Sequence, residues 1–323
     1  MNSSYREALS KWHGKPYYSL NAYLQDTYHE KIYKIALNAG LTCPNRDGKL
    51  DTRGCIFCSS GGSGDFAVPL SSPLHFQKSF EEGKAKLSRK HTGSRFIAYF
   101  QAYTNTYGPL PYLRSIYEAA LREPSVAGIS IATRPDCIPE EVVTLLVNLK
   151  EEFPDKFVWI ELGLQTIHEE TARFIRRGYS LEVYDRCVMT LRQAGIPVIT
   201  HVILGLPSET REHVLETISH INSLGIWGIK LQLLHILKET DLASLYMQGD
   251  YVPLTKEAYL DLVIDCLEQL DPHIVVHRVT GDGPKDLLLA PLWSLNKRDV
   301  LNSLHREMKH RNTYQGKLYH VMT

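Results

Sequence analysis

Residues 43–58 read Cys43-Pro-Asn-Arg-Asp-Gly-Lys-Leu-Asp-Thr-Arg-Gly-Cys55-Ile-Phe-Cys58 and follow an apolar, β-rich run at residues 33–41. The loop places three cysteines close together in the chain, and the last two form a Cys-x-x-Cys pair around Phe57. Thiolates at this spacing lie within reach of one metal centre. Because chemistry on parallel strands collects where each strand ends, the loop predicts a metal site at the carboxyl edge of a sheet.

Short β-rich runs alternate with longer helical patterns along the rest of the chain. We predict strands at residues 33–41, 96–101, 128–133, 157–162, 197–204, 228–234 and 274–279. We predict helices at residues 74–89, 111–122, 139–152, 168–176, 181–194, 209–224 and 256–269, and a last one at 297–311. This alternation predicts an α/β fold with a parallel sheet, and the number of units favours a closed or partly closed (β/α) barrel. The Gly61-Gly-Ser-Gly64 run lacks the spacing of a dinucleotide-binding turn, which argues against a doubly wound sheet.

Length and composition are typical of a globular enzyme with one large domain. The 323 residues are 43% hydrophobic, and 36 Lys and Arg balance 36 Asp and Glu, so net charge gives no argument for a nucleic-acid partner. No apolar run is long enough for a membrane helix, and we expect a cytoplasmic protein with no membrane partner. Cys187 and Cys266 lie in helix-like apolar patterns and are predicted to fill the core. We expect the barrel over residues 1–290 and a helical, basic C-terminal extension over residues 291–323.

The three clustered cysteines allow three kinds of site. A structural zinc site needs a fourth ligand, and the nearest candidate is His75, beyond a Gly/Ser-rich stretch. A thioredoxin-type Cys-x-x-Cys pair leaves Cys43 unexplained. A [4Fe–4S] cluster held by Cys43, Cys55 and Cys58 leaves one iron without a protein ligand and open to a small molecule.

Further motifs stand at the ends of the other predicted strands, in a fixed order. They are Tyr99-Phe-Gln-Ala-Tyr-Thr-Asn-Thr106, Ser130-Ile-Ala-Thr-Arg-Pro-Asp136, Glu161-Leu-Gly-Leu-Gln-Thr166, Arg177-Gly-Tyr179 and Gly205-Leu-Pro207. Together with the cysteine loop, they resemble the radical S-adenosylmethionine (SAM) superfamily over roughly residues 15–310. The Cys-x11-Cys-x2-Cys spacing departs from the Cys-x3-Cys-x2-Cys most common there. It is similar to the radical-SAM half of the Elongator catalytic subunit and to a stand-alone bacterial branch of the YhcC/YtqA type.

The resemblance implies a partial (β/α)6-type radical SAM barrel in which Cys43, Cys55 and Cys58 hold a [4Fe–4S] cluster. The open iron then binds the amino and carboxylate groups of SAM. One electron cleaves SAM to methionine and a 5′-deoxyadenosyl radical, which abstracts hydrogen from a substrate. An electron donor of flavodoxin or ferredoxin type is implied as the source of that electron.

The same resemblance suggests SAM contacts at the strand ends. Gln101 and Asn105 belong to a segment that replaces the usual Gly-Gly-Glu motif, which meets the methionine amino group. Glu161 is positioned as an acceptor for the ribose hydroxyls, although a helix cap or a salt bridge would also explain it. Gln165 is expected at the ribose or the substrate, and Arg177 at the SAM carboxylate, with a solvated helix-end arginine as the alternative. Gly205 is expected to expose backbone groups to the adenine edge.

Two basic segments bear on the substrate. Residues 78–95 and residues 297–317 each hold six basic and two acidic side chains, which suits either a phosphate-tracking surface or a solvated helix face. The Elongator relative rewrites the C5 substituent of tRNA wobble uridine, so the resemblance implies tRNA as a partner. Because the sequence stops at Thr323 without an acetyltransferase half, we expect editing of an existing group, from carboxymethylaminomethyl to aminomethyl.

Other functions stay open at this point. A radical SAM enzyme acting on a small metabolite predicts the cluster without tRNA affinity. A non-catalytic zinc-binding scaffold predicts a colourless protein, and a tetrapyrrole-type oxidase would need a further substrate domain. The iron content of anaerobically purified protein separates the zinc scaffold from the enzymes.

Overall fold

The computed structural model describes residues 3–87 and 93–320 of the chain. The chain forms two compact units and passes between them several times. The cysteine unit contains residues Leu24–Gly163 and Gly178–Ile199. The C-terminal unit contains residues Met1–Tyr23, Leu164–Arg177 and Thr200–Thr323.

The cysteine unit is built on parallel strands in the order β2-β1-β3-β4-β5. These strands are β1 (Tyr33–Asn38), β2 (Val68–Pro69), β3 (Phe96–Phe100), β4 (Val126–Thr133) and β5 (Phe157–Gln165), whose last two residues belong to the C-terminal unit. In the register, Ile35 lies opposite Ala98 and Ser130 opposite Trp159. Every residue of β3 and β4 is buried, as is typical of strands in parallel sheets. This burial explains why β3 and β4 are nearly continuous apolar runs in the sequence.

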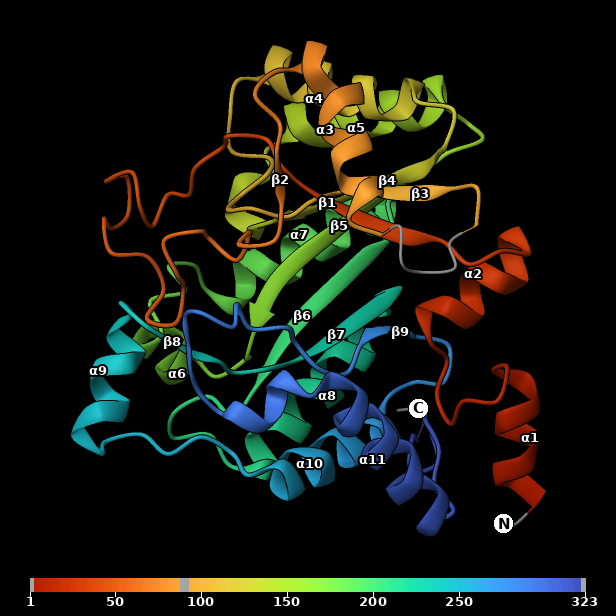
Figure 1. Ribbon diagram of the computed structural model, residues 1–323, viewed down its shortest axis with the longest axis vertical. Coiled ribbons are helices and arrows are strands. Elements are labelled where there is room, and N and C mark those ends of the chain that lie inside the picture. Colours follow the sequence, from red (N-terminus) through yellow and green to blue (C-terminus); the bar gives the residue numbers. More distant parts are fainter. Residues whose placement is uncertain (1–2, 88–92, 321–323) are drawn as a thin grey trace. The chain divides into compact units, whose positions relative to one another are not determined.

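Helices connect these strands and cover them. They are α3 (Phe76–Ala85), α4 (Leu110–Arg122), α5 (Glu140–Glu152) and α7 (Leu181–Gln193), with 3-10 turns η1 (Pro73–His75) and η2 (Pro135–Cys137). Figure 1 shows α3, α4 and α5 gathered together, with α3 packed on β1 and α4 on β4. Helix α4 buries Leu113, Ile116 and Tyr117 on one face, which follows from apolar residues spaced three and four apart.

The C-terminal unit has its own parallel strands, in the order β6-β7-β9, and a separate antiparallel pair, β8 with β10. Its strands are β6 (Val198–Leu204, whose first two residues belong to the cysteine unit), β7 (Gly228–Leu233), β8 (Ile236–Leu237), β9 (Val275–Arg278) and β10 (Leu288–Ala290). Its helices are α1 (Ser3–Lys11), α6 (Glu169–Phe174), α8 (Arg211–Leu224), α9 (Asp241–Gln248), α10 (Lys256–Gln269) and α11 (Lys297–His310), with the 3-10 turn η3 (Leu292–Leu295). Helix α2 (Leu20–Tyr28) joins the two units along the chain. Helix α10 packs against both α8 and α11 (Figure 1).

Each strand and helix predicted from the sequence is present among the described residues, and residues 88–89 of the helix predicted at 74–89 lie outside them. Two differences at the ends of elements have local causes. The first strand ends at Asn38, before the expected residue 41, because the Asn38 side chain accepts from the Gly40 amide at 3.0 Å in a turn. Helix α8 starts at Arg211 because the Thr210 side chain caps it and forms a capping box with His213. Helices α1, α2 and α9 and strands β2, β8 and β10 were not predicted.

Three further expectations concern the core, the C-terminus and membranes. Cys187 and Cys266 are buried in α7 and α10, as predicted. The predicted C-terminal helix is present as α11, whereas a domain boundary near residue 290 stays a prediction. None of the described helices is both long and apolar enough to cross a membrane.

Candidate functional site

The cysteine loop follows β1 and is closed by its own backbone hydrogen bonds. The Arg46 amide donates to the Cys43 carbonyl at 2.8 Å, and the Cys58 amide donates to the Cys55 carbonyl at 3.0 Å. All three cysteines are half-buried, and none is in a disulfide. The loop therefore holds three thiols in one short segment at the end of a strand.

The three thiols influence one another electrostatically. Burial, together with the neighbouring thiols of Cys58 and Cys43, raises the pKa of Cys55 to about 12, and Arg134 acts in the opposite direction. Burial also raises the pKa of Cys58, and the Arg46 guanidinium opposes that rise. A thiol must lose its proton to bind iron or zinc. Metal binding at this loop is therefore coupled to proton release, and the two arginines favour that release.

The possible metal-binding side chains of the structure can be compared with what a zinc site and a [4Fe–4S] cluster each require. Among the described residues, no group of three or more His, Cys, Asp or Glu side chains is placed so that it could hold a metal ion. His75 is exposed, and its Nδ1 lies 2.8 Å from the Ser72 hydroxyl. A structural zinc site needs a fourth ligand, whereas a four-iron cluster held by three thiolates leaves one iron open. The chemistry of the loop, three cysteines and no further ligand, therefore suits a [4Fe–4S] cluster better than structural zinc.

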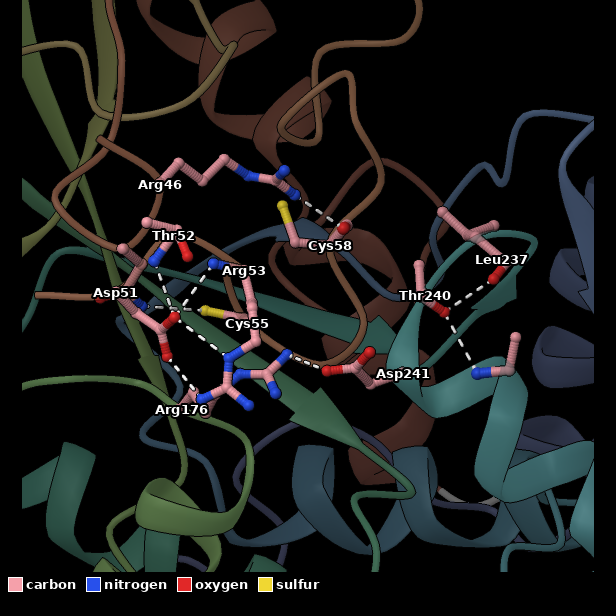
Figure 2. A network of polar contacts seen from close by, with 12 residues as sticks. Arg46, Asp51, Thr52, Arg53, Cys55, Cys58, Arg176, Leu237, Thr240 and Asp241 are labelled. Carbon is pink, nitrogen blue, oxygen red and sulfur yellow. Dashed lines mark hydrogen bonds and ion pairs between the residues drawn. The ribbon is translucent and has the colours of Figure 1, made fainter. Parts of the chain in front are cut away.

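Two side chains within the loop contact the predicted ligands or their backbone, and the sequence analysis had given neither a role. Arg46 Nη2 donates to the Cys58 carbonyl at 2.8 Å (Figure 2). It also donates to the Ser59 carbonyl at 2.7 Å. The Asn45 amide nitrogen lies 3.6 Å from Cys55 Sγ, in hydrogen-bonding geometry. A signal was available, because Asn45 and Arg46 stand only two and three residues after the first predicted ligand in the sequence.

The Thr-Arg-Pro-Asp and Arg-Gly-Tyr motifs meet beside this loop. Arg134 donates from Nε and Nη2 to the Asp136 carboxylate at 2.9 and 2.8 Å, and its guanidinium lies 4.8 Å from the Tyr179 ring centroid. Gly178 has a φ of 83°, and a Cβ at this position would lie 2.8 Å from Asn45 Oδ1. These motif residues therefore shape the surroundings of the loop.

The Glu161 carboxylate is fully buried on β5 and links three strands. It accepts from Lys34 Nζ on β1 at 2.5 Å and from Ser130 Oγ on β4 at 2.6 Å. The salt-bridge alternative for Glu161 is confirmed, and its contact with the SAM ribose stays a prediction. The sequence analysis missed Lys34, although a basic residue within the otherwise apolar first strand is a signal for a buried partner.

Gln101 and Asn105 have different surroundings. Gln101 Nε2 donates to the Ser63 carbonyl at 2.5 Å, which ties the end of β3 to the segment after the cysteine loop. Asn105 is fully buried, and its Nδ2 donates to the Ala132 carbonyl at 2.9 Å. Its Oδ1 is buried and has no hydrogen-bond partner among the described residues. Gln101 thus contacts the segment after the cysteine loop, and Asn105 donates a hydrogen bond to the backbone of β4. The contacts of both residues with SAM stay predictions.

Gln165 and Arg177 belong to the C-terminal unit. Arg177 is only 1% exposed, so the alternative of a solvated arginine is wrong. Its guanidinium donates to the carbonyls of Leu164 and Thr166 at 3.2 and 2.6 Å and to Glu169 at 3.1 Å. Gln165 is half-buried, with the uncommon φ of 63° for a non-glycine residue. The predicted contacts of both residues with SAM or substrate remain predictions.

Gly205 follows β6 in the C-terminal unit. Its φ is 88°, and a Cβ would lie 3.1 Å from Leu254 Cδ1, so the backbone conformation explains the glycine. Its carbonyl accepts from the Tyr251 hydroxyl at 2.6 Å. The expected contact with adenine stays a prediction.

His235 stands just after β7 and packs against a glycine-rich loop. A Cβ at Gly281 would lie 2.9 Å from His235 Cε1, and one at Gly283 would lie 3.4 Å from the ring. The buried Nε2 has no hydrogen-bond partner among the described residues. Burial lowers the pKa of His235 to about 4, and Arg278 adds to this effect while Asp282 opposes it. The imidazole is therefore neutral at pH 7.

The pKa of His235 predicts a stability change in weak acid. The unfolded chain binds this proton near pH 6.5, and the folded protein binds it only near pH 4. The neutral His235 therefore makes its full contribution to the free energy of unfolding above pH 6.5, and this contribution is lost as the pH falls toward 4. Between pH 7 and 5 the loss is about 2 kcal/mol. Urea unfolding at both pH values should show a smaller loss for His235→Gln than for the unchanged protein. The matched control is His273→Gln, whose ring is 85% exposed, and an equal loss in all three proteins would contradict the prediction.

Comparison with known proteins adds to this geometry. Residues 52–221 match the model of the Radical SAM superfamily, and residues 226–310 match the Radical_SAM C-terminal domain. Protein YtqA of Bacillus subtilis is 44% identical over 305 residues, which cover 94% of this chain and 93% of that protein. Elongator complex protein 3 of Schizosaccharomyces pombe is 22% identical, over 89% of this chain and 61% of that protein.

A solved structure supports the fold. The archaeal Methanocaldococcus infernus Elp3 with an N-terminal deletion aligns with a TM-score of 0.63 at 15% identity, over 88% of this chain and 64% of that chain. The likeness concerns the fold alone. Together with the parallel strands of the structure, it confirms the α/β fold class expected from the sequence, and the matches above confirm the resemblance on which the site was predicted.

Proposed function

We propose that this chain, which belongs to the radical SAM superfamily, modifies the C5 side chain of a tRNA wobble uridine. The family uses a [4Fe–4S] cluster and SAM. The observation that carries the radical chemistry of this proposal is the loop of three clustered cysteines, Cys43, Cys55 and Cys58, because a [4Fe–4S] cluster on three thiolates keeps one iron open to SAM. No other segment of the sequence brings three cysteines so close together.

The residues of this chain have distinct proposed tasks. When bound, the cluster and SAM supply an electron and a hydrogen-abstracting 5′-deoxyadenosyl radical. The three cysteines hold the cluster as thiolates. The Glu161 carboxylate accepts hydrogen bonds from the ribose hydroxyls of SAM, and Lys34 and Ser130 fix its orientation.

The proposed reaction converts a carboxymethylaminomethyl group to an aminomethyl group. The methylene carbon between the amine nitrogen and the carboxylate loses a hydrogen atom to the radical and then an electron to a one-electron acceptor of iron–sulfur or flavin type. The resulting imine adds water, which releases a two-carbon oxo acid and leaves the amine on the uridine. The relation to Elongator complex protein 3 supports this substrate class, because the resemblance implies C5 chemistry on wobble uridine.

Some of the basic side chains predicted to contact the tRNA backbone are exposed and are not neutralised by an ion pair with another described residue. Arg298, Arg306 and Lys309 on α11 are exposed and form no ion pair with another described residue. Other members of the two basic segments are neutralised: Lys84 by Glu81, Arg95 by Glu30, Lys297 by Asp282, and Arg311 by Asp261 and Glu307. Arg89 and Lys90 lie outside the described residues. The exposed α11 cations therefore support a phosphate partner, as do the exposed Lys78, Lys86 and Lys317 within their own segments.

Nucleoside analysis tests the proposed reaction. In a strain that lacks the gene, we expect tRNA to accumulate the carboxymethylaminomethyl nucleoside and to lose nearly all aminomethyl-derived nucleosides, measured by mass spectrometry. A plasmid copy of the gene should restore the profile, a Cys55→Ala copy should not, and a Cys266→Ala copy should. An unchanged wobble-uridine profile would overturn the tRNA proposal and direct the search to small-molecule substrates.

A further inference from the structure

Arg46 fixes a positive charge beside the ligand-bearing end of the cysteine loop. One guanidinium nitrogen, Nη2, donates to the Cys58 carbonyl at 2.8 Å (Figure 2) and to the Ser59 carbonyl at 2.7 Å. The side chain is half-buried, so this geometry is partly shielded from water. A hydrogen bond from a charged donor is stronger than one between neutral groups. The charge is therefore held in place at the peptide groups that directly follow Cys58.

A second side chain of the loop contacts sulfur. Asn45, the neighbour of Arg46 in the chain, is 2% exposed and places its amide nitrogen 3.6 Å from Cys55 Sγ. Asn45 and Arg46, the second and third residues after Cys43, thus contact Cys55 and the backbone of Cys58.

The loop is built around the Arg46 side chain. Gly54 has a φ of 77°, and a Cβ there would lie 2.9 Å from Arg46 Nε. The Gly54 amide in turn donates to the Asn45 carbonyl at 2.7 Å. A larger residue at position 54 would displace the guanidinium or strain the turn. The segment between Cys43 and Cys55 therefore contains the half-buried Arg46 side chain and the glycine that it packs against, in addition to joining two of the predicted ligands.

We propose that Arg46 is a positioning residue that raises the reduction potential of the cluster held by Cys43, Cys55 and Cys58. The reduced cluster carries one more negative charge than the oxidised cluster, so a fixed positive charge beside its ligands stabilises the reduced form more. This inference rests on the cluster ligands of the proposed function. It identifies Arg46 as a residue that makes the cluster easier to reduce.

Arg53 offers a matched control in the same loop. Its side chain is 64% exposed and pairs with the Asp51 carboxylate at 2.9 Å. Arg53→Gln removes the same charge as Arg46→Gln from the same loop, but from a solvated position. Arg46→Lys keeps the charge and loses the planar donor fork.

The test uses the full chain, reconstituted anaerobically with iron and sulfide, as the unchanged protein, Arg46→Gln, Arg46→Lys and Arg53→Gln. Iron and sulfide per chain are measured first, and the reduced cluster is then followed by electron paramagnetic resonance during a redox titration. We expect Arg46→Gln to hold a full cluster with a more negative midpoint potential. At the midpoint of the unchanged protein, its reduced fraction should fall well below one half. Arg46→Lys and Arg53→Gln should stay close to the unchanged protein.

Two kinds of outcome separate this inference from the proposed function. If the unchanged protein binds no cluster, the proposed function fails. If it binds the cluster, the inference alone is overturned by an unshifted potential in Arg46→Gln, by an equal shift in Arg53→Gln, or by a shift in Arg46→Lys as large as that in Arg46→Gln. Loss of the cluster from Arg46→Gln would overturn it too, because Arg46 would then be needed for assembly of the loop.

Discussion

Replacing Cys43, Cys55 or Cys58 with alanine is expected to lower the bound iron from about four atoms per chain to none after anaerobic reconstitution. With only three thiolates in the loop, the loss of one leaves a cluster with two protein ligands. SAM cleavage to 5′-deoxyadenosine should be abolished in the same variants. Iron assay and the visible absorption of the purified protein give the first readout, and chromatography of the SAM products gives the second.

The chain provides its own controls for this experiment. Cys187→Ala and Cys266→Ala remove thiols that are buried in α7 and α10. Both variants should keep a full cluster and the cleavage of SAM, with only a moderate loss of stability from the small cavity. Stoichiometric zinc and no iron in the unchanged protein would reject the cluster assignment for all three loop cysteines.

The second large effect is expected at the Glu161 carboxylate. Glu161→Gln should weaken SAM binding by about one to two orders of magnitude, because a charge-assisted hydrogen bond is worth roughly 1.5–3 kcal/mol. The iron content should not change, because Glu161 is not a predicted ligand. The same variant should lose about 3 kcal/mol of stability, since Lys34 loses its ion-pair partner. This value is at the low end for buried pairs because the Lys34 side chain stays 19% exposed.

A double variant separates the two roles of Glu161. Lys34→Met/Glu161→Gln replaces the pair without leaving a buried charge, so most of the lost stability should return. SAM affinity, measured by equilibrium binding to the cluster-loaded protein, should stay low. Recovery of SAM affinity together with stability would show that Glu161 only supports the fold, and the ribose contact would then be rejected.

The motifs at the strand ends show which features of the site can be predicted from the sequence and which cannot. The Arg177-Gly-Tyr179 stretch suggested a ligand-binding arginine, yet the Arg177 guanidinium is buried on the carbonyls of Leu164 and Thr166. In the same stretch, Gly178 leaves room for Asn45, which lies far away in the sequence. The pattern marked the right segment, but the role of each residue depended on neighbours that the sequence does not place.

The sequence by itself determined the order of strands and helices and the set of three clustered cysteines. Both are local properties, because periodicity fixes each element over a few residues and the loop joins its cysteines covalently within 16 residues, from Cys43 to Cys58. The cap that starts α8 at Arg211 is equally local, since Thr210 and His213 are three residues apart.

Only the tertiary structure decided which polar groups are buried together. Lys34 and Glu161 are 127 residues apart, and they meet because the parallel register brings β1, β3, β4 and β5 together in order. His235 has a lowered pKa because the loop around Gly281 folds against its ring and removes water. Arg46 acts on Cys58 through a backbone turn that brings residues 46 and 58 into contact. Burial and charge pairing depend on separations in space, which strand register and loop closure set and which the sequence alone does not specify.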